Sequence, residues 1–174
     1  WMHALAAARH AGTAAEAVLM RAIVRYVQAF PLALHHPKED QHLFKRLRER
    51  SDEVNAELDE LERQHHRDHQ LVPDLAAMVE ALASCQDAAA ALAATRVLEP
   101  AVQAYASFLW DHMGREEGVI LPAAQQHLLA EDWAAIDAAF AMNRDPNFGD
   151  ESDQDYRKLF SRIVNRAPAP VGLG

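Results

Sequence analysis

Apolar residues recur every three or four positions over long stretches of the chain, the spacing of amphipathic helices. No stretch shows the alternation of apolar and polar residues that is typical of a strand. The predicted long helices cover about 13–50, 52–84 and 87–122, and a shorter one covers 131–140. Residues 2–10 read as the tail of an earlier helix, and we expect upstream sequence to be missing because the chain begins Trp1-Met2.

Prolines and turn-forming residues interrupt this helical pattern. A proline removes a backbone donor, so we expect the first long helix to bend or break at Pro31 and Pro37. Residues 143–153 are rich in Asp, Asn, Pro and Gly and predict a loop. An amphipathic helix at 156–164 and a Pro/Gly tail follow.

Long helices joined by short loops predict an all-α fold. We expect an antiparallel up-down-up-down four-helix bundle with an additional short C-terminal helical segment. Residues 1–142 would form the bundle, its first helix cut short. Residues 143–174 would be a loop, a C-terminal helix and a tail packed on the same domain.

Composition fits a single helical domain and excludes some classes of function. The chain has 174 residues, of which 50% are hydrophobic and only 6 are Gly. A net charge of −9 argues against nucleic-acid or anionic-membrane partners. No run of 18 uninterrupted apolar residues occurs, so no membrane span is expected. The single cysteine, Cys85, excludes an internal disulfide and leads us to expect a cytoplasmic location.

Two segments, 35–44 and 112–121, share the pattern His-x-x-basic-Glu-acidic-x-x-apolar-apolar. Residues four apart share one face of a helix, so each segment can aim an imidazole and a carboxylate at one point. The predicted helix at 52–84, between these two segments in the chain, adds His65 and His69, one turn apart on its apolar stripe. Imidazoles and carboxylates are the ligands of non-haem iron and of some zinc sites. The sequence therefore predicts a metal centre, in which two bridging carboxylates could join a pair of divalent ions.

These residues resemble the hemerythrin-like, or HHE cation-binding, proteins of the bacterial single-domain type. The resemblance extends over about residues 14–142, and its most specific parts are 34–41, 61–70 and 110–123. It implies a four-helix bundle with two non-haem iron ions joined by an oxo or hydroxo bridge, for which zinc is a possible substitute.

The same resemblance implies a ligand set. The metal ligands would be His35, Glu39, His65, His69, His112 and Glu116. Both glutamates would bridge the irons. One iron would take His65, His69 and His112, and the other His35 with a first-helix histidine. That last ligand is His3, His10 or a residue upstream of Trp1.

Neighbouring polar residues have plainer interpretations. His36 and His66 follow expected ligands by one residue and turn about 100° away, which favours outer or surface roles. Asp40 is expected to be a solvated neighbour, and Tyr105 to pack in the core or line the site.

The resemblance implies a protein that binds or senses a small diatomic ligand, dioxygen or nitric oxide, or that handles iron. We expect a ligand-binding protein rather than an enzyme, and predict no catalytic residue. The alternatives are a ferritin-like di-iron oxidase, suggested by the Glu-x-x-His pairs Glu39/His42 and Glu62/His65, and a zinc-stapled or metal-free interaction bundle. The oligomeric state stays open.

Overall fold

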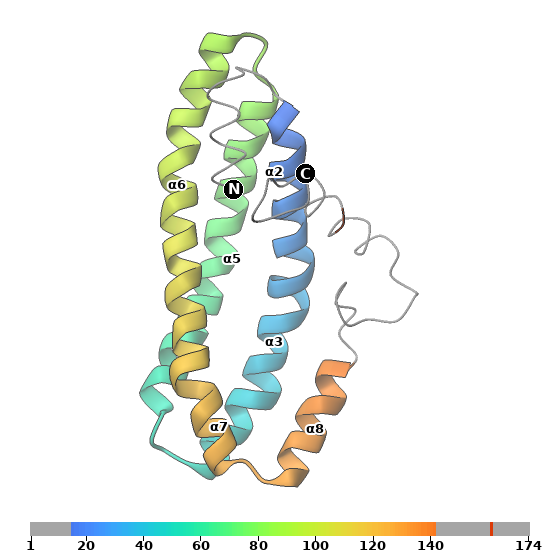
Figure 1. Ribbon diagram of the computed structural model, residues 1–174, viewed down its shortest axis with the longest axis vertical. Coiled ribbons are helices and arrows are strands. Elements are labelled where there is room, and N and C mark those ends of the chain that lie inside the picture. The colour runs from blue at the N-terminus through green and yellow to red at the C-terminus, as the bar shows by residue number, and fades with distance from the viewer. Residues whose placement is uncertain (1–14, 142–160, 162–174) are drawn as a thin grey trace.

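The computed structural model describes residues 15–141 and 161, and in this part of the chain it contains helices and no strands (Figure 1). The prediction of an all-α helical bundle is confirmed. The expected helix tail at 2–10, the loop at 143–153 and, apart from Ser161, the expected helix at 156–164 lie outside the described residues. The packing of 143–174 on the same domain stays a prediction.

The first long helical run is continuous from Ala15 to Arg50, although its turns vary in width. Two of its segments are π-helical, with wider turns than an α-helix. Its segments are α2 (Ala15–Val27), η1 (Gln28–His35), α3 (His36–Lys38), η2 (Glu39–Phe44) and α4 (Lys45–Arg50).

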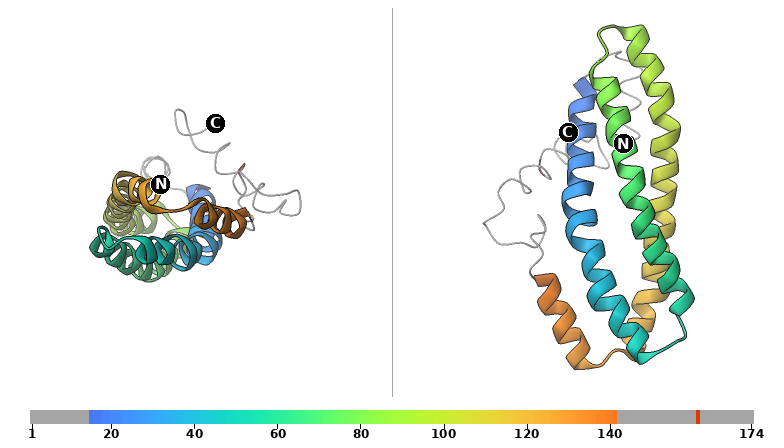
Figure 2. Two further views of the ribbon diagram at one scale, coloured as in Figure 1. Left: turned by 90° about the horizontal axis from the view of Figure 1, so that it is seen from below. Right: turned by 180° about the vertical axis from the view of Figure 1, so that it is seen from behind.

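After the first run come α5 (Asn55–Ala83), α6 (Ala88–Arg115), η3 (Glu116–Ile120), α7 (Leu121–His127) and α8 (Ala130–Ala141). The elements α6, η3 and α7 form one continuous run, which is antiparallel to α5 (Figure 1). Asp87 begins α6 by accepting a hydrogen bond from the Ala90 amide at 2.8 Å, which satisfies a free helix-end donor. The chain then turns back through α8, which lies beside the end of the first run that contains η2 (Figure 2).

The prolines do not break these helices. At Pro31 the first run widens into η1, and the His36 amide donates to the Pro31 carbonyl, five residues back. Pro73 and Pro100 lie within α5 and α6, which continue past them as α-helices. The wider turns in η1 therefore accommodate a proline where the sequence predicts a bend or a break.

The buried apolar residues form two clusters along the bundle axis. The upper cluster joins α2, α5 and α6 and contains Leu19, Met20, Val24, Leu32, Val72, Leu75, Val79, Leu82, Ala91, Leu98, Val102 and Tyr105. The lower cluster joins the other ends of the helices and contains Leu43, Phe44, Leu47, Leu58, Leu61, Ile120, Ala123, Ala124, Leu128 and Ile136. On α5, residues of the lower cluster end at Leu61 and those of the upper cluster begin at Val72. Buried polar residues occupy the layer between.

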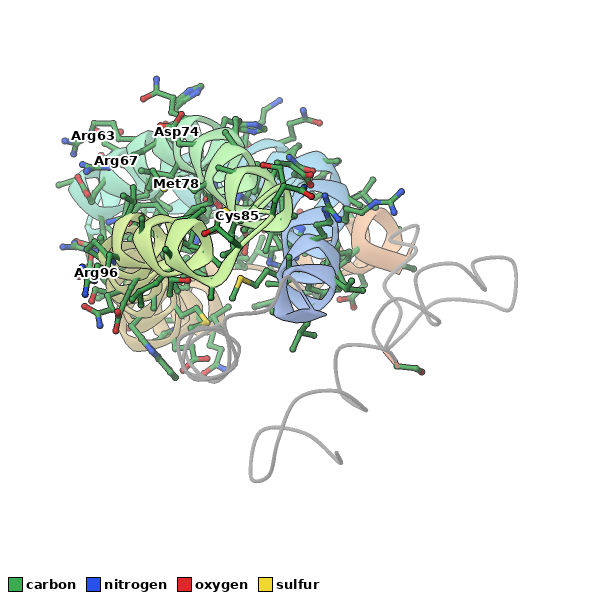
Figure 3. All side chains as sticks on the ribbon, turned by 90° about the horizontal axis from the view of Figure 1, so that it is seen from above. Arg63, Arg67, Asp74, Met78, Cys85 and Arg96 are labelled. Atoms are coloured by element: carbon green, nitrogen blue, oxygen red, sulfur yellow. The ribbon has the colours of Figure 1, made fainter. Side chains whose placement is uncertain are left out.

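The outer surface of the bundle is charged. Arg63 and Arg67 on α5 and Arg96 on α6 point away from the helices (Figure 3). The run Ala17–Arg50 contains a window apolar enough to cross a membrane by length and composition alone, with a mean hydropathy of 1.4. Core helices of bundles pass the same test, and Met20 and Val24 on this run pack in the upper cluster. The expected absence of a membrane span stays a prediction.

Candidate metal centre

Four buried side chains meet in the layer between the two apolar clusters. They come from three helical runs: His36 from α3, Glu39 from the start of η2, His65 from α5 and His112 from α6. One ligand atom of each lies within 4.8 Å of those of the other three. Three imidazoles and a carboxylate at this spacing form a set that can hold a metal ion.

The packing of α5 explains why His65 faces inward. Its buried positions alternate in steps of three and four, which is the repeat of a helix packed against neighbouring helices. From Leu58 to Leu82 these positions are Leu58, Leu61, His65, Asp68, Val72, Leu75, Val79 and Leu82, and Gln64 is buried beside this stripe. The stripe passes through Asp68 and leaves His69 exposed on the neighbouring face.

The first run presents two histidines to the same glutamate. His36 and Glu39 are three residues apart across the short α3 segment, and both are buried. His35, half-buried, places Nε2 3.1 Å from Glu39 Oε1. The other oxygen of this carboxylate, Oε2, lies 3.5 Å from His65 Nε2. Glu39 therefore spans two imidazoles, one on each side.

Glu116 forms the corresponding pair on the last run. Its Oε1 lies 3.1 Å from Nε2 of His112, one turn earlier. Glu116 begins η3, the π-helical segment that follows α6, just as Glu39 begins η2. The two similar sequence segments thus have the same local structure, with a glutamate at the start of a widened turn.

Each inward-facing imidazole of α5 and α6 is held from behind. His65 Nδ1 donates to Asp40 Oδ1 at 2.8 Å, and His112 Nδ1 donates to Gln64 Oε1 at 3.1 Å. Because a carboxylate and an amide oxygen can only accept, Nδ1 carries the proton in both rings. Nε2 of each ring is then left with a lone pair directed at the centre, as metal ligation requires.

Gln64 links His112 to the surface. Its amide nitrogen donates to Glu60 Oε1 at 3.0 Å and to Asp111 Oδ2 at 2.9 Å. Arg115 donates to the same Asp111 oxygen at 2.8 Å. This chain of hydrogen bonds fixes which end of the Gln64 amide faces His112 and so fixes the orientation of the ring.

The two carboxyls are in different electrostatic environments. Burial raises the pKa of Glu39, the hydrogen bond from His35 opposes this rise, and the charge of Glu116 adds to it. Burial also acts on Glu116, but the close contact with His112 and the charge of that ring hold its pKa below the usual value. Although burial disfavours the charged form of His112, the contact with Glu116 raises its pKa.

His36 is kept neutral. Burial lowers its pKa to about 2, and the neighbouring imidazoles of His65 and His112 act in the same direction. A neutral imidazole is the form that binds a metal ion.

The residues fit a divalent cation. Glu39 Oε2, His65 Nε2 and Glu116 Oε1 are buried and have no hydrogen-bond partner in the described part of the chain. Buried polar atoms without partners are costly, so such atoms gathered at one point call for an explanation. A cation among them would satisfy these lone pairs and balance the carboxylate charge, and the mixed nitrogen and oxygen donors suit iron or zinc.

The structure brings together five of the six residues that the resemblance implies. Glu39, His65 and His112 belong to the four-residue group, and His35 and Glu116 contact its members. His69 is exposed and lies outside the group, so its role as a ligand stays a prediction.

Sequence reasoning missed Gln64, which holds His112, and three further contributors. His36 is buried in the group rather than turned to the outside, and its spacing of three from Glu39 was the available signal. Asp40 holds His65 and is not simply solvated. Asp68 occupies a core position, and an acidic residue within an apolar stripe was the signal for it.

A pocket of about 310 Å³ reaches the centre from the side of α8. His35, Glu39 and Glu116 line it on the side of the metal centre. Its apolar walls come from η2, η3, α7 and α8 and include Leu43, Ile120, Leu121, Trp133, Ile136 and Phe140. Glu117 and Asp137 also line it. The pocket therefore offers a small uncharged molecule a mainly apolar path to the glutamates and His35.

Comparison with protein families finds a match over most of the chain. The family model described as the hemerythrin HHE cation binding domain matches residues 2–124 of the 174. Comparisons with curated proteins and with solved structures give no match.

Proposed function

The chain belongs to the hemerythrin HHE cation-binding family, and on that premise we propose that it is a non-haem di-iron protein. It binds or senses a diatomic ligand, dioxygen or nitric oxide, or it handles iron. The observation that carries this proposal is the buried group of three imidazoles and a carboxylate within 4.8 Å, together with its unpartnered ligand atoms.

Five residues with the required chemistry surround the proposed metal positions. His65 and His112 would serve one position, and His35 would serve the other. Glu39 and Glu116 each have two oxygens and could reach both, since Glu39 already lies between His35 and His65. The family resemblance also implies His69 as a metal ligand. Because His69 is exposed, it is the least supported member of the set.

When bound, an iron pair supplies an open coordination position and reversible one-electron chemistry to a diatomic ligand. The surrounding protein contributes selectivity. The mainly apolar walls of the pocket favour an uncharged molecule, and its carboxylates, Glu117 and Asp137 among them, disfavour anions. Ile120 and Phe44, both fully buried, close the centre from below. Asp40 and Gln64 hold two imidazoles so that they do not rotate when the ligand arrives or leaves.

Binding and sensing suit this site better than oxidase chemistry of the ferritin type. A ferritin-like centre would need Glu62 beside His65, but Glu62 pairs with Arg48 on the outside of α5, at 3.2 Å. We therefore propose a ligand-binding protein rather than an enzyme. A cytoplasmic location and the absence of nucleic-acid and membrane partners remain expectations from the sequence.

Metal analysis and optical spectroscopy of the purified protein test the proposal. We expect iron, near two atoms per chain when both positions are filled, and near-ultraviolet and visible charge-transfer bands. These bands should change when the reduced protein meets dioxygen or nitric oxide. His66→Ala is the matched control, because His66 is exposed beside His65. A protein that retains only zinc, or that binds no metal when iron is supplied, would refute the di-iron assignment.

A further inference from the structure

We propose that His36 is a third imidazole ligand of this centre and that a buried pair, Asp68 and Tyr105, orients it. This inference rests on the proposed function, since it assumes that the centre binds a metal. It differs from the ligand set implied by the sequence, which takes its third imidazole from His69.

The position of His36 is the first observation. The residue is 5% exposed, and one of its ring nitrogens lies within 4.8 Å of the ligand atoms of Glu39, His65 and His112. Its ring stacks on His65 with centroids 4.2 Å apart and an interplanar angle of 7°. The contact with His65 prevents the ring from swinging away, so His36 is fixed in the group before any metal arrives.

Asp68 is the second observation. It is 1% exposed, and both carboxylate oxygens lack a hydrogen-bond partner in the described part of the chain. Its Oδ2 lies 4.0 Å from His36 Nδ1, slightly beyond hydrogen-bond distance. A buried carboxylate next to a neutral imidazole is poorly compensated on its own. A cation bound on the far side of the His36 ring would polarise that ring and so balance the negative charge of Asp68.

Tyr105 completes the arrangement. It lies on α6, 3% exposed, with a buried hydroxyl beside the Asp68 carboxylate. The hydroxyl is the group best placed to hold one Asp68 oxygen while the other faces His36. Tyr105, Asp68 and His36 thus form a row across three helices, α6, α5 and α3, that ends at the metal group.

The other two imidazoles of the group follow the same rule. His65 uses Nδ1 to reach Asp40, and His112 uses Nδ1 to reach Gln64. His36 directs Nδ1 at Asp68. In metal sites the non-ligating ring nitrogen is commonly held by a carboxylate or an amide oxygen, which orients the ring and strengthens it as a donor. All three rings turn Nδ1 toward an oxygen, within hydrogen-bond distance in His65 and His112 and at 4.0 Å in His36. We therefore assign Nε2 of His36 to the ion as well.

Iron(II) titration of the metal-free protein under anaerobic conditions, against a competing chelator, tests the ligand assignment. We expect His36→Ala to weaken binding by about 10- to 100-fold or more. His69→Ala represents the competing assignment and should weaken binding far less, and His66→Ala is the control. A second substitution, His36→Gln, keeps a polar side chain of similar size in case the alanine variant folds poorly.

The outcomes separate the two proposals. Wild-type protein that binds no iron overturns the proposed function itself. Wild-type protein that binds iron, with His36→Gln as tight as wild type or with the larger loss at His69→Ala, overturns this inference alone.

The reduction potential of the bound iron tests the orienting role. A carboxylate behind an imidazole makes it a stronger donor, so Asp68→Asn should raise the potential and lower iron affinity by about 10-fold. Tyr105→Phe removes the hydroxyl beside the carboxylate, so the charge of Asp68 should act more strongly on His36 and the potential should shift the opposite way. Asp74→Asn, at an exposed position on the same helix (Figure 3), is the matched control. An Asp68→Asn variant that behaves like the control, or shifts of one sign in both variants, would overturn the role of the pair.

Discussion

Removing the metal should destabilise the fold by a measurable amount, because the centre lies inside the bundle. Three buried ligand atoms, Glu39 Oε2, His65 Nε2 and Glu116 Oε1, lack hydrogen-bond partners in the described part of the chain. At about 1–3 kcal/mol for each unsatisfied group, the metal-free centre is destabilised by about 3–9 kcal/mol. A metal at a hundred times its dissociation constant stabilises the folded state by about 2.7 kcal/mol. For a chain of this size, that stabilisation raises the melting temperature by about 5–11 °C.

The assay is thermal unfolding followed by circular dichroism, near neutral pH, before and after treatment with a chelator. The helical signal reports the whole bundle, and metal analysis of the same samples shows how much iron is left. Adding iron(II) back should restore the higher melting temperature. Glu39→Ala is the control, since it removes a carboxylate from the group and should make the melting temperature insensitive to iron.

An unchanged melting temperature in a sample that has lost its iron would refute the reasoning. It would mean that water or rearranged side chains satisfy these atoms as well as a metal does. An equal stabilisation of Glu39→Ala by iron would place the binding site elsewhere.

Three further predictions concern the site, the core and α8. Glu39→Ala should lower occupancy at both metal positions and His35→Ala at only one, as a metal titration would reveal; equal single-site losses would exclude bridging by Glu39. Leu61→Ala should lower the free energy of unfolding in denaturant by about 2–5 kcal/mol, because Leu61 is fully buried in the lower cluster, whereas truncation of an exposed apolar residue should cost under about 0.5 kcal/mol. The hydrogen bonds from Arg50 hold the pKa of Asp132 below its usual value. These bonds therefore stabilise the folded protein fully at pH values above the carboxyl pKa of the unfolded chain. The stabilisation is lost as the pH falls through the lowered pKa of the folded protein. Asp132→Asn should remove this acid-dependent loss of stability, as unfolding measured at several pH values would show. If the variant loses as much stability in acid as the wild type, other carboxyl groups cause the loss.

The helices could be predicted from the sequence because a helix depends on the spacing of residues that are close together in the chain. Apolar residues at steps of three and four locate the long runs, and Asp87 starts α6 as expected. Pairing within one helix is also local, so His35 with Glu39 and His112 with Glu116 could be placed on common faces from their spacing.

The rest of the centre depends on contacts between helices. The stacking of the His36 ring on His65 could not be predicted from the spacing of His36 in the sequence. That contact depends on the wide turns of η1 and on how α3 packs against α5. The choice between Asp68 and His69 as the inward residue on α5 depends on a rotation of less than one third of a turn, which the neighbouring helices fix. Sequence periodicity determines which residues share a face of a helix. Only tertiary packing determines what that face meets, and so which of the ten histidines gather at one point.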